Sequence, residues 1–146
     1  MGFRAAFYKG TKTGLAGIYN RLVRWIDKGQ FSHCELIFSD GLSASASYMD
    51  GGVRFKQINF DPALWDFIDL PPEKEAAARQ WFRDHLGQGY DLAGNIHFIL
   101  GPVSDSKSKW FCSEAAAAAL GMDDPWRYGP NGLATVLWDR GCDGNR

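Results

Sequence analysis

Alternating apolar and polar positions predict a β-sheet in the first half of the chain. Short runs rich in apolar and β-favouring residues, bounded by glycine, aspartate or serine, are typical of strands joined by turns. The runs that fit this description are residues 3–8, 30–38, 42–48, 53–58 and 64–70.

Apolar residues at helical spacing predict helices between and after these strands. The predicted helices cover residues 13–28, 73–87, 92–100, 112–120 and 133–138. Residues 101–108 form a polar loop, and we expect a mobile tail from about residue 139. Because no linker or internal repeat divides the chain, we expect residues 1–146 to form one α+β domain. Its antiparallel sheet would carry helices packed on it.

The strand predicted at residues 30–38 has two different faces. Side chains alternate across a strand, so His33 and Glu35 share one face with apolar neighbours. Cys34 and Leu36 lie on the other face, which has the pattern of an ordinary core. An imidazole and a carboxylate on a largely apolar strand need partners, because unpaired polar groups are costly to bury.

Cys112 opens the helix predicted at residues 112–120, which contains five consecutive alanines and ends before Gly121. The first turn of a helix has unpaired backbone N–H groups and the positive end of the macrodipole, and both stabilise a thiolate. With His33 as a base, Cys112 is a candidate nucleophile. The alternative is a small apolar residue packed under the helix.

Composition limits the classes of function. The net charge of -1 and the lack of a Lys/Arg run argue against nucleic-acid binding. Three separated cysteines without a Cys-x-x-Cys pair predict neither a structural zinc site nor a disulfide framework. We also expect no cofactor. No signal peptide or membrane span is evident, so we expect the protein to act in a reducing cytoplasm or to be delivered by something other than a signal sequence. Six Trp and ten Phe fit either a compact core or a groove for an acyl chain, peptide or sugar.

Two short motifs resemble a known family. Ser-His-Cys-Glu-Leu at residues 32–36 and Trp-Phe-Cys-Ser-Glu at residues 110–114 resemble the circularly permuted branch of the NlpC-type papain-like cysteine enzymes, which includes lecithin:retinol acyltransferase. In that branch the His strand precedes the Cys helix, as it does here. The likeness covers residues 3–120 and is greatest to small proteins of tailed bacteriophages and prophages. It implies a permuted papain-like fold with catalytic Cys112 and His33.

The third residue of the site is the least decided part of this prediction. Members of the permuted branch carry a polar third residue on the strand after the His strand, and that strand here offers only Ser43, Ser45 and Ser47. Glu35 is chemically better suited, because a carboxylate fixes the histidine tautomer and stabilises the imidazolium. We therefore predict Glu35, with Ser45 as the alternative.

Two further groups are candidates around the reacting carbonyl. The backbone N–H of Cys112 is the natural donor to an oxyanion, because it lies at the helix start. Tyr8, at the end of the first strand, is a candidate cleft or oxyanion residue, with a structural role as the alternative.

These residues predict a thiol-dependent hydrolase or acyltransferase acting on an amide, ester or thioester. The resemblance permits peptide, peptidoglycan or acyl substrates. A phage cell-wall amidase is one of the enzymes that this range includes. Two other classes stay open: a phage structural or assembly protein that keeps the fold without catalysis, and an acyl- or lipid-binding module.

Overall fold

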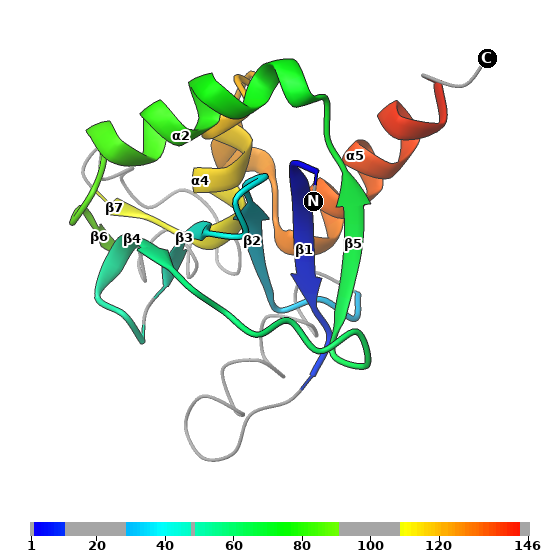
Figure 1. Cartoon of the computed structure of the whole chain (residues 1–146), viewed down its shortest axis with the longest axis horizontal. Coiled ribbons are helices and arrows are strands. Elements are labelled where there is room, and N and C mark those ends of the chain that lie inside the picture. Colours follow the sequence, from blue (N-terminus) through cyan, green and yellow to red (C-terminus); the bar gives the residue numbers. More distant parts are fainter. Residues whose placement is uncertain (1, 11–28, 48, 91–108, 144–146) are drawn as a thin grey trace.

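A five-stranded antiparallel sheet forms the centre of the protein (Figure 1). The computed structural model describes residues 2–10, 29–47, 49–90 and 109–143. The strands lie in the order β4-β3-β2-β1-β5 and each corresponds to one of the predicted runs. Their bounds are Arg4–Tyr8 (β1), His33–Ile37 (β2), Ser43–Ser47 (β3), Gly52–Lys56 (β4) and Trp65–Asp69 (β5).

Helices pack on one face of this sheet, which confirms the predicted α+β class. The helical elements are η1 (Pro72–Lys74), α2 (Glu75–Asp84), α4 (Cys112–Ala119), η2 (Pro125–Arg127) and α5 (Pro130–Asp143). In Figure 1, α2 runs across the top of the molecule and α5 lies beside the β5 end of the sheet. A short parallel pair, β6 (Gly89–Tyr90) and β7 (Lys109–Trp110), leads into α4.

The main core lies between the sheet and α4. Cys34 and Leu36 of β2 belong to the same buried cluster as Ala115 and Ala116 of α4. Alanine side chains are short, so the helix can approach the central strands closely. Residues of α2 and α5 complete the cluster on the same face of the sheet, among them Ala78, Phe82, Leu133 and Leu137.

The opposite face of the sheet is also buried at its centre. Ala6, Glu35 and Ser43 on that face are fully buried. The Ser43 hydroxyl donates to the Lys56 carbonyl at 2.7 Å, so its burial leaves no unsatisfied group. Ser43 is therefore a buried polar group whose hydrogen bonding is satisfied.

The C-terminal helix is longer than the sequence pattern predicts. Instead of residues 133–138, α5 spans Pro130–Asp143, and residues 139–143 of the expected mobile tail are helical. Proline fits the first turn of a helix because it needs no hydrogen bond to its nitrogen. Buried Leu133 and Leu137 hold one side of α5 against the core.

Some predicted elements lie outside the described residues. These are the helices at 13–28 and 92–100 and the polar loop at 101–108. Among the residues that the structure describes, no helix is long and apolar enough to cross a membrane.

Candidate active site

Cys112 is the first residue of α4, as predicted, and only 2% of it is exposed. The preceding residue, Phe111, has an extended backbone and acts as the N-cap without a side-chain hydrogen bond. The C-terminal end of α4 is closed by Gly121, whose φ of 71° suits a glycine. The thiol therefore lies at the positive end of the helix dipole.

Side-chain contacts on both sides fix the start of α4. Trp110 donates its indole N–H to Gln88 Oε1 at 2.6 Å. Ser113 donates its hydroxyl to the Tyr128 carbonyl at 2.7 Å. Cys112 thus lies between Trp110 and Ser113, whose side chains are hydrogen-bonded to two different segments of the chain.

His33, the first residue of β2, is held through its backbone neighbours. It is opposite Tyr8 in the β1–β2 register, and the Ser32 N–H donates to the Tyr8 carbonyl at 3.0 Å. On the other side, the Asn131 side chain accepts from the Phe31 N–H at 2.9 Å and donates to the Phe31 carbonyl at 3.0 Å. The amide of Asn131 therefore pairs with Phe31 as a neighbouring strand would.

Glu35 forms the hydrogen bond that its predicted orienting role requires. His33 Nε2 lies 2.7 Å from Glu35 Oε1, and the carboxylate is fully buried, whereas 22% of the His33 side chain is exposed. Alternation along β2 placed the two residues on one face, and the long Glu35 side chain spans the distance between them. Because Nε2 faces Glu35, Nδ1 is the ring nitrogen left for Cys112.

The sequence analysis missed Arg54, which pairs with Glu35. Its guanidinium donates from Nη1 to Glu35 Oε2 at 2.8 Å and from Nη2 to Oε1, a bidentate pair. Its Nε donates to Asp50 at 2.8 Å, and Lys56 also binds Asp50. The result is a continuous chain of polar groups from His33 to Lys56. A sequence signal existed: Asp50-Gly51-Gly52 predicts a hairpin, and its register places Arg54 opposite Ser45 on the polar face.

Arg54 keeps the Glu35 carboxylate charged although it is buried. Burial by itself would raise the pKa of Glu35, but the hydrogen bonds from Arg54 and His33 outweigh it and lower that pKa below 4.5. Burial opposes the charge on Arg54 as well, but Glu35 and Asp50 together raise the pKa of its guanidinium. Arg54 and Lys56 also lower the pKa of Asp50 to about 2, against the opposing effect of burial.

Cys112 and His33 interact as a thiol–imidazole pair. The pKa of Cys112 lies well below 9.0: a hydrogen bond from the Cys34 thiol is the largest cause, burial opposes it, and the charge and hydrogen bond of His33 add to it. Burial alone would lower the pKa of His33, but the Cys112 thiolate and Glu35 together raise it from 6.5 to about 9. Near neutral pH the geometry favours thiolate and imidazolium.

The prediction that Cys34 is an ordinary core residue is incomplete. Cys34 is buried in the core, but it also contacts the Cys112 sulfur through its thiol and its backbone N–H. Burial and the adjacent Cys112 thiolate raise the pKa of Cys34, so it stays a protonated donor. The structure holds Cys34 and Cys112 as free thiols.

Helix α4 does not lie on the face of β2 that carries His33 and Glu35. The helix packs on the Cys34 and Leu36 face, because its alanines need an apolar surface and could not satisfy the buried Glu35 charge. His33 contacts Cys112 at the start of the strand. The first residues of β2 have no partner in β3, because the ladder between these strands begins only at Leu36, which pairs with Ala44.

Ser45, the alternative third residue, does not contact the His33 ring. Its hydroxyl donates to the Cys34 carbonyl at 2.7 Å, where the β2–β3 ladder has no backbone pair. The short Ser45 side chain reaches this nearby carbonyl, and His33 Nε2 already has Glu35 as its hydrogen-bond partner. Ser45 therefore supports β2 rather than orienting the imidazole.

Tyr8 lies on the same face as His33 and packs its ring against Trp65, with the ring centroids 5.0 Å apart. Its hydroxyl end lies close to where a Cβ on Gly10 would be, so the ring points toward the residues that follow β1. The indole of Trp65 also meets the His33 ring edge-on, with centroids 6.3 Å apart. This geometry gives Tyr8 a packing role beside the site.

Among the described residues, no group of three or more His, Cys, Asp or Glu side chains could hold a metal ion. No protein-family model matches the chain, and a search of curated proteins finds no match. Fold and site together define a class: an α+β protein in which a helix-terminal cysteine contacts a histidine that is bonded to a buried carboxylate.

Proposed function

We propose that this protein is a thiol-dependent hydrolase or acyltransferase that attacks an amide, ester or thioester carbonyl, built on a permuted papain-like fold. One observation supports this above the others: the His33 ring contacts the Cys112 thiol while Nε2 lies 2.7 Å from the buried Glu35. A nucleophile, a base and a group that orients the base are the parts that covalent catalysis by cysteine requires.

Each side chain has a definite task in the proposed reaction. The Cys112 thiolate attacks the carbonyl carbon. The resulting oxyanion accepts a hydrogen bond from the backbone N–H at the start of α4. The His33 imidazolium then gives its proton to the departing amine, alcohol or thiol, which leaves an acyl group on Cys112. Neutral His33 next takes a proton from water or an acceptor alcohol or amine, whose attack releases the acyl group and restores the thiolate.

Thiol reactivity against pH tests the pair directly. Limited alkylation with iodoacetamide between pH 5 and pH 9, followed by peptide mapping, compares Cys112 with Cys34 in one sample. Because the pKa of Cys112 is lowered and that of Cys34 is raised, Cys112 should label faster and reach its plateau at lower pH. In His33→Gln the midpoint for Cys112 should move to higher pH.

Acyl transfer is measured on the same preparations with small ester and thioester substrates, then with peptidoglycan fragments. Cys112→Ala should abolish acyl-protein formation, and Cys142→Ala serves as the control that removes a thiol elsewhere. Cys112 labelling no faster than Cys34 would refute the nucleophile. Fast labelling without turnover on any of these substrates would instead favour a structural or assembly protein that keeps the site.

A further inference from the structure

A second site lies at the other end of α4. A cavity of about 240 Å³ is lined by the end of β5, Pro71 before η1 and Lys74 at its end, the residues after α4 and the last turns of α5. Since Cys112 is at the N-terminus of α4 and Leu120 follows its C-terminus, the helix separates the two places by roughly 12 Å. The cavity is therefore no part of the thiol site.

The walls of this cavity are apolar. Leu70, Leu120, Met122 and Leu137 line it, and all four are buried residues of the core cluster. Water would find few polar partners on these walls, whereas an alkyl chain would replace it favourably.

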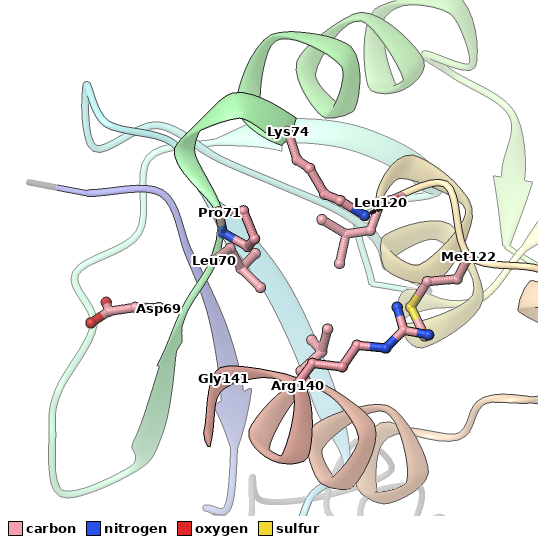
Figure 2. Close-up of a pocket in the computed structure, with 9 residues that line it drawn as sticks. Asp69, Leu70, Pro71, Lys74, Leu120, Met122, Arg140 and Gly141 are labelled. Atoms are coloured by element: carbon pink, nitrogen blue, oxygen red, sulfur yellow. Dashed lines mark hydrogen bonds between the residues drawn. The ribbon is translucent and has the colours of Figure 1, made fainter. Parts of the chain in front are cut away.

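Two cationic side chains border the same cavity. Figure 2 shows Lys74 and Arg140 on the side of Leu120 and Met122, whereas the carboxylate of Asp69 points away. Lys74 donates to the Leu120 carbonyl at 3.1 Å, which holds its ammonium group at the rim. Within the part of the chain that the structure describes, neither cation has a carboxylate partner (residues 2–10, 29–47, 49–90 and 109–143).

We propose that this cavity binds a single-chain amphiphile with an anionic head group, such as a medium-chain carboxylate. The alkyl chain lies against Leu70, Leu120, Met122 and Leu137, and the carboxylate lies beside Lys74 and Arg140. Apolar walls supply burial of the chain, and the two cations select the charge of the head group. Because the cations lie at the opening of an apolar cavity, an anionic amphiphile should bind more tightly than a neutral lipid or a cationic detergent.

Titration with sodium decanoate, followed by amide chemical shifts of the unmodified protein, tests the site without any substitution. The largest shift changes are expected at Leu120, Met122 and Leu137. Decanol and decyltrimethylammonium, with the same chain length, should bind more weakly than decanoate. Equal binding of all three, or shift changes centred elsewhere, would overturn the proposal.

Variants then separate the two parts of the site. Arg140→Gln and Lys74→Gln should each weaken decanoate binding about two- to fivefold and leave decanol binding unchanged, whereas Arg83→Gln on the exposed side of α2 should change neither. Leu137→Phe, which fills the cavity, should weaken both ligands on the order of tenfold, and Thr135→Phe on the exposed side of α5 should not.

The Cys112→Ala protein gives an independent readout. It should bind decanoate as the unmodified chain does, so failure of the thiol chemistry would leave this site standing. Loss of decanoate binding in Cys112→Ala, with an unchanged melting temperature, would place the ligand at the thiol site and refute the separate cavity.

Discussion

At the scale of single residues, the charge on Glu35 depends on Arg54. A buried carboxylate without partners becomes protonated, and a protonated Glu35 could not stabilise an imidazolium on His33. The bidentate pair with Arg54 offsets the cost of burial, and Asp50 in turn holds Arg54. The charge on Glu35 therefore depends on a group of four side chains that come from two strands and one turn.

Removal of Arg54 should destabilise the protein far more than removal of its neighbour Lys56. Arg54→Gln leaves a buried charge with His33 as its main partner, and we expect a loss of about 3–5 kcal/mol in unfolding free energy. Lys56→Gln, which removes an exposed partner of Asp50, should cost about 0–1 kcal/mol. Urea melts at pH 7 measure both, and equal losses would contradict a role for the Arg54–Glu35 pair.

The pH dependence of this loss has a definite sign. The pKa of Glu35 is lower in the folded protein than the 4.5 of the free side chain. Its contribution to stability is therefore present above about pH 4.5 and is lost as the pH falls through the folded pKa. The difference between Arg54→Gln and the unmodified protein should shrink below pH 4.5. A difference that stays constant down to pH 3 would show that ionisation of Glu35 is not its cause.

At the scale of elements, the site depends on how α5 supports the start of β2. The Asn131 amide forms both hydrogen bonds with the backbone of Phe31, two residues before His33. A side chain at Gly29 would overlap Asn131, so the close approach of the two segments requires glycine there. An element near the C-terminus thus fixes a catalytic candidate near the N-terminal third of the chain.

Asn131→Ala should weaken this support. Two backbone groups of Phe31 lose their partners, and we expect a cost of about 1–3 kcal/mol. The alkylation midpoint of Cys112 should also move toward the value of His33→Gln, because His33 is less well held. Asp139→Ala, on the exposed side of the same helix, is the matched control. A loss of stability with an unchanged midpoint would limit Asn131 to a structural role.

At the scale of the whole molecule, the core and the thiol site contribute differently to stability. Leu36 is fully buried between the sheet and α4, so Leu36→Ala creates a cavity. Cys112 belongs to the same cluster, but its pairing with His33 serves chemistry rather than packing in the proposed function. Functional groups commonly cost stability, and removing them returns part of it.

Thermal and urea melts of two variants check this difference. Leu36→Ala should cost about 2–5 kcal/mol, as large-to-small core substitutions do. Cys112→Ala should leave the unfolding free energy within about 1 kcal/mol of the unmodified protein or raise it. If Cys112→Ala costs as much as Leu36→Ala, the cysteine is a structural residue and the proposed function loses its basis.

The sequence by itself determined the five strands of the main sheet, the start of α4 and the placement of His33 and Glu35 on one face of β2, because these follow from local rules. Alternation puts residues i and i+2 of a strand on one face, and an alanine run before a glycine defines a helix. Only the tertiary structure decided the partners that lie far apart in the chain. Arg54 reaches Glu35 through the register of a hairpin, and Cys34 reaches Cys112 through the packing of α4 on the sheet. The amphiphile cavity needs four separate segments to meet, and no local pattern encodes that meeting.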